Sequence, residues 1–169
     1  MTPWFKRKFS TIEDNGLFPT IIERLEGTPA RLWAKIQQIP NALHEQKLNG
    51  KWSIKEEIGH LIDLEPLWYG RVEDLKSRKE ELRAADLTNA QTHQANHNQH
   101  PIWVLLTQFA TERAQLVVLL RSLTEKDLEQ SALHSRLKTP MRLIDLAYFV
   151  AEHDDHHLVH ITKLSTASQ

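Results

Sequence analysis

Apolar residues recur every three or four positions over residues 54–75, and this spacing limits the fold more than any other feature of the sequence. It places them on one face of an α-helix. Ser53 and Glu56 precede the stripe with the three-residue spacing of a capping box, which closes the start of a helix. Glycine is scarce, at 5 residues, and no stretch alternates apolar and polar residues over the length of a strand. The sequence therefore predicts an all-α fold.

The remaining helical regions are recognised by their punctuation. They are expected over residues 17–39, from about Pro101 to Leu120, and from Thr139–Pro140 to about Leu164. Gly27-Thr28-Pro29 interrupts the first region, and we expect Thr28 to be the N-cap of a new stretch that begins at Pro29. Pro66 lies well inside the second helix, where we expect a kink and not a stop.

The connections between these regions differ in length. Residues 86–100 are polar and without periodicity, which predicts a long loop of the kind that often shapes a site. A short helical turn, capped by Thr124 with Asp127, follows the third helix. Four helices joined mostly by short connections predict a four-helix bundle, either antiparallel or partly crossed.

The 169 residues fit one domain. We assign residues 1–16 to an N-terminal arm and residues 17–169 to the bundle. The arm carries a basic cluster over residues 6–8 and is expected to be solvated and partly packed. It lacks the apolar core of a signal peptide, and the longest apolar runs are far shorter than the roughly 20 residues of a membrane span. A cytoplasmic protein with no membrane partner is expected.

Net charge and cysteine content exclude several function classes. The formal net charge is −1, so there is no overall basic field to attract nucleic acid, and a small-molecule partner is expected. There are no cysteines, which excludes disulfides, cysteine-ligated zinc and a cysteine nucleophile from this chain.

Histidine is the unusual residue, with 10 in the chain and four between residues 153 and 160. On a helical wheel His157 falls inside the apolar stripe and His153 close beside it, whereas His156 lies about 100° away and is expected to face solvent or a helix edge. Two histidines four apart on one face suit a single metal ion. His60 flanks the stripe of the second helix and is the candidate third ligand. The alternative is a set of core histidines satisfied by hydrogen bonds.

Other polar residues carry weaker signals. His93 and His97 share the four-residue spacing but stand in the polar loop, so we expect them to be solvated. Glu152, Asp154 and Asp155 are expected to be surface charges, although one of them could orient an imidazole. Arg113 stands in the apolar seam of the third helix. It either extends to the surface or serves as an anion-binding group in the bundle pocket.

Two motifs together resemble the DinB/YfiT-like superfamily of metalloenzymes. They are Trp52-Ser-x-x-Glu-x-x-x-His60-Leu on the second helix and Glu152-His153-x-x-His156-His157 on the fourth. The resemblance covers nearly the whole chain. It implies a four-helix bundle with up-down-down-up topology, often dimeric, so a homodimer is one expected partner. It also implies one divalent metal ion per chain, held by His60, His153 and His157. His160 departs from the family pattern and leaves room for a fourth ligand.

The resemblance leaves three functions open. Characterised relatives include S-transferases that use low-molecular-weight thiols and a mycothiol-dependent maleylpyruvate isomerase, so the leading hypothesis is a metal-dependent transfer of such a thiol to an electrophile. The second is a hydrolase that uses metal-bound water. The third is a non-catalytic module in which the metal braces the bundle or the fold serves dimerisation. Imidazole ligands suit zinc, nickel, iron and copper alike, so the sequence does not select the metal.

Overall fold

The computed structural model describes residues 1–166, and most of them are helical. The α-helices are α1 (Phe18–Glu26), α2 (Thr28–Ile36), α3 (Ile54–Lys76), α4 (Ala90–Gln94), α5 (Ile102–Arg121), α6 (Glu125–Leu128) and α7 (Leu143–Thr166). Short 3-10 turns are η1 (Trp4–Lys6), η2 (Asn15–Leu17), η3 (Asn41–Leu43) and η4 (His97–Gln99). A two-stranded antiparallel hairpin pairs β1 (Ser131–Leu133) with β2 (Pro140–Arg142).

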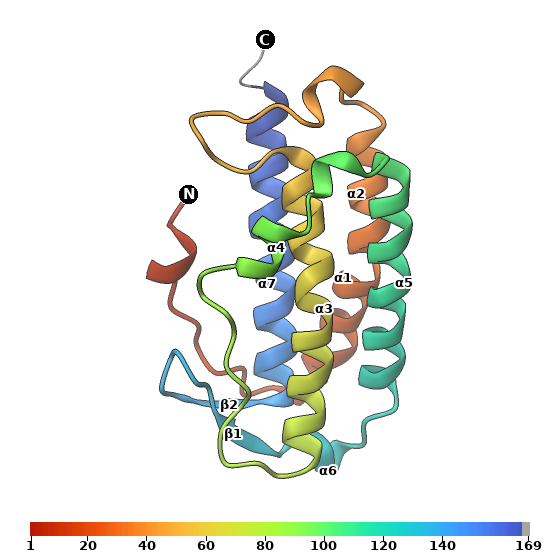
Figure 1. Cartoon of the computed structure of the whole chain (residues 1–169). Helices are drawn as coiled ribbons and strands as arrows, with labels where there is room; N and C mark the ends of the chain where they lie inside the picture. Colours follow the sequence, from red (N-terminus) through yellow and green to blue (C-terminus); the bar gives the residue numbers. More distant parts are fainter. Residues whose placement is uncertain (167–169) are drawn as a thin grey trace.

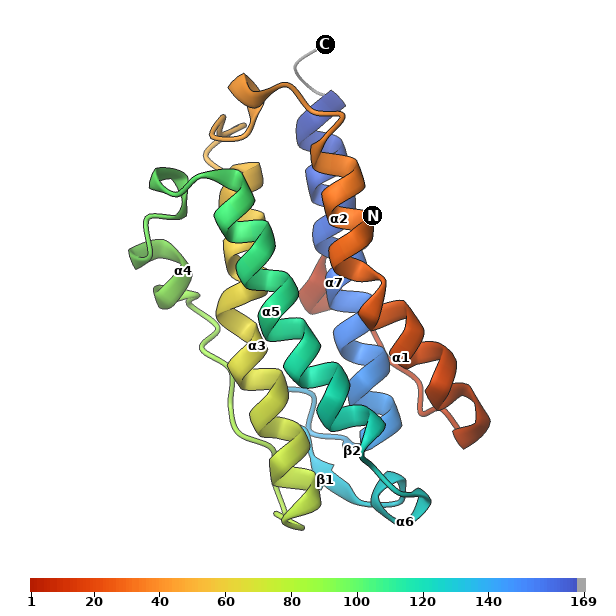
Figure 2. The same ribbon diagram turned by 90° about the vertical axis from the view of Figure 1, so that its right-hand side faces the viewer.

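The long helices form a four-helix bundle with up-down-down-up topology, as predicted. In the view of Figure 1 the chain rises through α1 and α2, descends through α3, descends again through α5 and rises through α7. Helix α3 packs against both α5 and α7, and α1 packs against α7 and α5. Figure 2 shows α2 following directly on α1, so that the two short helices serve as one arm of the bundle.

Because α3 and α5 run in the same direction, the chain between them must return along the bundle. Helix α3 has 23 residues and is therefore roughly 35 Å long. The returning segment, residues 77–101, contains α4 and η4, so the long loop predicted over 86–100 includes two short helical turns that were not predicted. These turns have no apolar stripe of their own. Polar contacts from Thr92 and His97 to Asp63 of α3 hold them in place, and periodicity cannot reveal such contacts.

The helix starts confirm some predictions and correct others. Ser53 forms the predicted capping box with Glu56, and α3 continues through Pro66. Thr28 is not an N-cap: α2 begins at Thr28 itself, whose hydroxyl donates to Asp154 (2.9 Å). The hydroxyl that was predicted to cap the helix therefore donates to a buried carboxylate on α7.

The fourth helix begins later than predicted. Residues 140–142 belong to β2, and α7 starts at Leu143. The carboxylate of Asp145 accepts hydrogen bonds from the backbone amide of Arg142 (3.0 Å) and from that of Ile12 (2.8 Å). Asp145 thus stabilises the start of α7 and attaches the N-terminal arm to it. The short helix α6 has the predicted contact, with Asp127 accepting from the amide of Thr124 (2.8 Å).

Two hydrophobic clusters fill the bundle, one in each half. The lower one includes residues of α1, the second half of α3, the second half of α5 and the first half of α7. The upper one includes residues of α2, the first half of α3, the first half of α5 and the end of α7. Between them lies a buried polar layer, which we call the Arg113 layer. It consists of Thr28, Glu65, Arg113 and Asp154.

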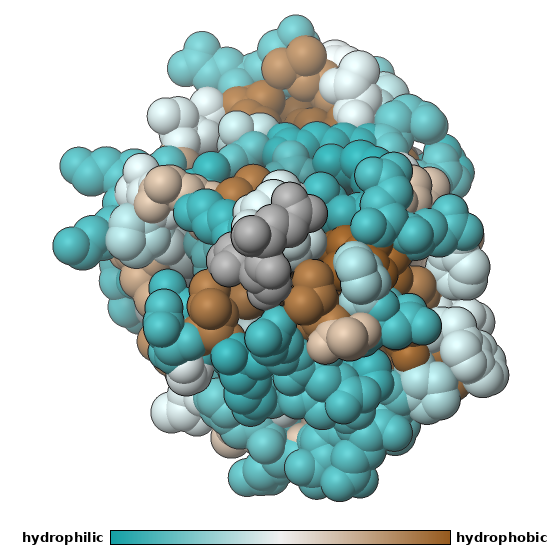
Figure 3. All heavy atoms as spheres, turned by 90° about the horizontal axis from the view of Figure 1, so that it is seen from above, coloured by the Kyte–Doolittle hydropathy of each residue, from teal (hydrophilic) through white to brown (hydrophobic). Residues whose placement is uncertain are grey.

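The upper end of the bundle is largely polar (Figure 3). Seen from above, hydrophilic side chains cover most of the end of the bundle, with a few hydrophobic ones between them (Figure 3). Within residues 1–166, none of the helices combines the length and the apolar character needed to cross a membrane.

Candidate metal centre

Three histidines from two helices converge on one point inside the bundle, and we call them the three-histidine cluster. His60 comes from α3, and His153 and His157 come from α7. Each offers a ring nitrogen, and these nitrogens lie within 4.8 Å of one another. The ring centroids are 4.4 Å apart for His153 and His157, 4.9 Å for His60 and His157, and 5.4 Å for His60 and His153. All three side chains are buried.

Glu57 orients His157. Its carboxylate lies 2.5 Å from Nδ1 of His157 and 3.2 Å from Nδ1 of His160. Burial alone would raise the pKa of Glu57, but these hydrogen bonds outweigh it and lower the pKa to about 2. The carboxylate therefore holds a proton on Nδ1 of His157. That leaves the lone pair on Nε2, which lies 3.1 Å from Nε2 of His153.

A chain of hydrogen bonds orients His60 in the same way. The hydroxyl of Thr92 donates to Asp63 (2.8 Å), so its oxygen is an acceptor for Nδ1 of His60 at 3.1 Å. His97 also contacts Asp63, through Nε2 at 2.9 Å. The proton of His60 is thereby placed on Nδ1 and the lone pair on Nε2. Partners of this kind commonly fix the tautomer of a metal-binding histidine.

His153 and His156 are buried without complete hydrogen bonding. Nδ1 of each has no hydrogen-bond partner within the described residues. Burial lowers the pKa of His153 well below its usual value, and nearby His157 and His60 add to this effect. Burial, followed by the neighbouring His157 and His160, lowers the pKa of His156 to about 4. Both rings are therefore neutral at neutral pH.

The expectation that His156 faces solvent or a helix edge was wrong, because the N-terminal arm covers it. The indole of Trp4 packs against the rings of His156 and His153, with centroids 5.4 Å and 5.0 Å away. Arg7 donates to the carboxylate of Glu152 at 2.7 Å, which holds the arm against α7. A helical wheel of α7 alone contains no information about this cover.

The returning segment, residues 77–101, also contains a histidine whose predicted exposure was wrong. His97, expected to be solvated, is buried against Asp63, whereas His93 is exposed as expected. Gly59 explains the close fit: a Cβ at that position would lie 2.2 Å from atoms of the His97 ring. Thr92 and Asp63 were not predicted as site residues, because no local pattern identifies them. Glu57, which stands three residues before His60, could have been found by that spacing.

Arg113 is buried, and it neither extends to the surface nor lines the cavity beside the histidines. Its guanidinium donates to Glu65 through Nε (3.1 Å) and Nη2 (2.6 Å), and to Asp154 through Nη2 (2.9 Å) and Nη1. Nη1 also donates to the carbonyl of Leu25 (3.2 Å). The two carboxylates raise the pKa of Arg113, although burial opposes them. Each nitrogen is engaged, so the predicted role of Arg113 in binding an anion in the pocket is corrected to a role inside the bundle.

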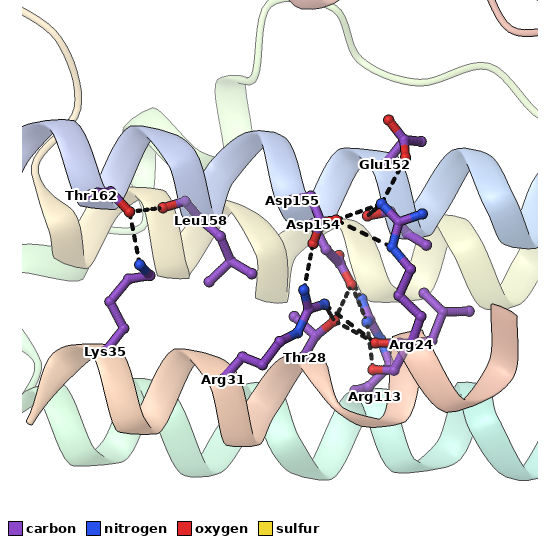
Figure 4. A network of polar contacts seen from close by, with 12 residues as sticks. Arg24, Thr28, Arg31, Lys35, Arg113, Glu152, Asp154, Asp155, Leu158 and Thr162 are labelled. Atoms are coloured by element: carbon purple, nitrogen blue, oxygen red, sulfur yellow. Dashed lines mark hydrogen bonds and ion pairs between the residues drawn. The ribbon is translucent and has the colours of Figure 1, made fainter. Parts of the chain in front are cut away.

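The acidic residues beside the histidines are mostly paired and not free surface charges. Figure 4 shows Asp154 reaching Arg113 and Thr28, and Asp155 reaching Arg24 and Arg31. Glu152 binds Arg24 and Arg7. Asp154 is fully buried, so its assignment to the surface was wrong. Within the described residues, the carboxylate that contacts a histidine of the cluster is Glu57, from the other helix.

A cavity of about 590 Å³ opens beside the three-histidine cluster. Its apolar wall consists largely of aromatic rings, which belong to Trp4, Phe5, Trp52, Trp68 and Phe149. The ring of Trp52 packs against His60 at 4.6 Å between centroids, and Trp68 packs against His153 at 5.5 Å. The cluster therefore faces a pocket large enough for a small molecule.

The donor set fits a divalent ion. The Nε2 atoms of His153 and His157 face each other at 3.1 Å, and the proton of His157 is held on the opposite ring nitrogen by Glu57. Three neutral imidazoles suit zinc, nickel or iron, and three protein ligands leave positions for water or substrate. His160 contacts Glu57 and so lies next to this set. Glu57, His157 and His160 form a second group whose potential ligand atoms lie within 4.8 Å of one another.

Comparison with known proteins agrees with this architecture. YfiT from Bacillus subtilis, described as a probable metal-dependent hydrolase with an unusual four-helix bundle topology, superposes with a TM-score of 0.82 at 22% identity, over 96% of this chain and 93% of YfiT. The mycothiol-dependent maleylpyruvate isomerase superposes with a TM-score of 0.68 at 12% identity, over 95% of this chain and 63% of the isomerase. A comparison with curated proteins gives no match. The sequence profile of the DinB superfamily matches residues 24–161. This chain belongs to the DinB superfamily.

Proposed function

We propose that this protein is a metal-dependent enzyme that transfers a low-molecular-weight thiol to an electrophilic small molecule. One divalent ion per chain is held by His60, His153 and His157. The observation that supports this proposal is the orientation of the cluster: Glu57 and Thr92 leave the lone pairs of His157 and His60 free, beside an aromatic cavity of about 590 Å³. Because the chain has no cysteine, the thiol must come from solution.

A divalent ion in this position would supply the positive charge that lowers the pKa of a thiol or of water. Free thiols have a pKa near 8.5, so only a few per cent of the thiol molecules are ionised to thiolate at pH 7. The sulfur then attacks the electrophilic carbon as the leaving group departs with its bonding electrons, and the thiol proton goes to solvent. With a pKa of about 2, Glu57 remains ionised and orients His157 without accepting the substrate proton.

The aromatic wall of the cavity excludes water from the site. Trp4 of the N-terminal arm packs on Phe149 (5.0 Å between centroids) and closes one side of the cavity. Excluding water there strengthens electrostatic interactions between the cluster and its substrate. A small molecule with an apolar body is therefore the proposed partner, and nucleic acid and membranes are not. The homodimer and the cytoplasmic location expected from the sequence remain predictions.

A hydrolase is the second candidate, and the description of YfiT favours it. The two reactions differ in their need for thiol. The test is to assay bacillithiol, mycothiol, glutathione and cysteine in turn against a haloalkane or an aromatic halide, alongside an ester and an amide without thiol. Thiol transfer predicts turnover that needs both thiol and metal, with an advantage that shrinks above about pH 9, where free thiol ionises unaided. Turnover of the ester or amide with no dependence on thiol would overturn the transferase in favour of hydrolysis.

Chelation tests the non-catalytic alternative. If EDTA lowers the melting temperature strongly and the bound metal has no exchangeable water, the ion braces the bundle and the enzymatic proposal fails. If the metal-free protein keeps its fold and the metal has exchangeable water, the site is open for chemistry. Elemental analysis of protein purified without a histidine tag identifies the ion.

A further inference from the structure

A second group of polar side chains lines the same cavity and has no acidic partner. Arg71 belongs to α3, and His134 and Arg136 belong to the loop that joins β1 to β2. The side chain of Arg71 is 1% exposed. Its Nε donates to the carbonyl of Arg83 (3.0 Å), but its Nη2 has no hydrogen-bond partner. Nη2 of Arg136 is likewise buried without a partner.

The hydrogen bonds of His134 make this group a set of donors. The backbone amides of Arg136 and Leu137 donate to Nδ1 of His134 at 3.1 Å and 3.2 Å. Burial, and then the charges of Arg71 and Arg136, lower the pKa of His134 to about 4, so the ring is neutral at neutral pH. Its one proton must therefore be on Nε2, which faces Nη1 of Arg71 at 3.2 Å. The N–H groups at Nη1 of Arg71 and at Nε2 of His134 therefore point at the same part of the cavity.

No carboxylate among residues 1–166 forms an ion pair with Arg71 or Arg136. Asp74, the acidic residue with most influence on Arg71, is already engaged by Arg83 and Lys79, at 2.8 Å and 2.7 Å. Buried guanidinium groups are normally paired, and a buried N–H without an acceptor destabilises the fold. The group therefore lacks a negatively charged hydrogen-bond acceptor.

From these contacts we propose that Arg71, Arg136 and His134 bind the carboxylate of the substrate at the end of the cavity away from the three-histidine cluster. A planar guanidinium matches a carboxylate with two parallel hydrogen bonds, and the Nε2–H of His134 can add another. The inference rests on the proposed function only in calling the bound molecule a substrate.

The distance between the two sites describes the molecule further. Trp68 limits that distance: Cζ of Arg71 and the ring of His153 both lie against its indole, so they are at most about 11 Å apart. The indole of Trp68 lies between the sites, with its centroid 5.4 Å from Cζ of Arg71 and 5.5 Å from the ring of His153. The substrate class is therefore an extended acid: a carboxylate at one end, an apolar middle against Trp68 and Phe149, and the reacting atom at the histidine end.

The test measures binding of simple carboxylates to the full-length protein stripped of metal with EDTA, so that the result does not depend on the metal. Hexanoate is compared with hexanamide and hexanol by calorimetry and by the fluorescence of the tryptophans in the cavity. We expect hexanoate to bind at least tenfold more tightly than hexanamide and to weaken as KCl is raised. Arg71→Gln and Arg136→Gln should each lose at least tenfold in hexanoate affinity. Arg121→Gln, at an exposed arginine of α5, controls for the loss of one charge and should not.

Each outcome decides the proposal. Equal binding of hexanoate and hexanamide, or unchanged hexanoate affinity in Arg136→Gln, would overturn it. Arg136 is only partly buried, so this variant keeps the test decisive if Arg71→Gln does not fold. Tighter binding of inorganic phosphate than of hexanoate would replace the carboxylate with a phosphorylated substrate. If the protein binds hexanoate but shows no metal-dependent activity, the proposed function is refuted and the carboxylate site stands.

Discussion

Two buried polar clusters include residues from neighbouring turns of α3 and α7, yet only one of them has a partner for each of its buried side-chain nitrogens. In the Arg113 layer, Glu65 and Asp154 bind all three nitrogens of the guanidinium. In the three-histidine cluster, Nδ1 of His153 has no partner and two Nε2 atoms face each other. Burial is similar in both. What distinguishes the candidate binding site from the structural layer is its incomplete hydrogen bonding.

His153 and Asp154 show how local this difference is. They are adjacent on α7, about 100° apart around the helix. His153 faces the cavity and its aromatic wall, whereas Asp154 contacts Thr28 of α2 and Arg113 of α5. One face of the helix therefore contributes to a candidate site, and the next stabilises the bundle. Substitutions on the two faces should separate stability from metal binding.

The largest effect is expected from Arg113→Met. It leaves Glu65 and Asp154 buried without their cation, and breaking a buried ion pair in this way costs about 3–5 kcal/mol of unfolding free energy. Urea denaturation followed by circular dichroism measures it. A triple variant that adds Glu65→Gln and Asp154→Asn removes the unpaired charges and should recover part of the loss. A loss below about 1 kcal/mol in the single variant would show that the layer is not structural.

Removing a ligand should affect metal binding and leave the fold intact. We expect a loss of stoichiometric metal in each of the variants His60→Ala, His153→Ala and His157→Ala. The metal affinity should fall by more than roughly 100-fold, which is the upper end of the loss caused by removing a residue that only orients a ligand. His156→Ala is the matched control, since His156 is buried on the same helix but lies outside the cluster. Calorimetry and elemental analysis measure both. Full metal content in His60→Ala would refute the site, and loss in His156→Ala would move the ligands to His156 and His160.

A smaller effect is expected from Thr92→Val, which removes the hydroxyl that holds His60 and Asp63. Loss of such an outer partner typically weakens metal binding by roughly 10–100-fold. Thr111→Val is the control, because Thr111 is exposed on α5 and its hydroxyl bonds only to the carbonyl of Thr107. An unchanged metal affinity in Thr92→Val, measured by competition with a chelator, would mean that the return segment does not orient His60.

The smallest effect is a dependence of stability on pH in the metal-free protein. Burial, with His157 nearby, lowers the pKa of His60 to about 3, below the value of about 6.5 in an unfolded chain. The unfolded state therefore binds more protons, and the contribution of His60 is complete above pH 6.5 and is lost as the pH falls. Between pH 6.5 and 5.5 it accounts for about 1 kcal/mol. Urea denaturation at both values, in the wild type and in His60→Ala, checks this: the two proteins should differ in slope, and equal slopes would contradict it.

Much of the fold was predictable because its signals are local. The capping box at Ser53 and Glu56 and the apolar stripe that follows it specify α3 without reference to any other segment. The four-residue spacing of His153 and His157 places their rings on one face of α7 for the same reason. The family motifs joined His60 to this pair. Helical periodicity is a property of neighbouring residues, so the sequence by itself determined the long helices and which of their faces are apolar.

Only the tertiary structure decided which partner each buried polar group meets. Arg113 meets Glu65, 48 positions away, and not a pocket, and Trp4 covers His156 from the other end of the chain. The hairpin loop brings Arg136 to Arg71 of α3, and the return segment brings Thr92 to His60. These contacts depend on how segments distant in sequence close upon one another. A polar residue that will be paired and one that will be left free for a ligand look the same in the sequence, because the difference lies in the partner.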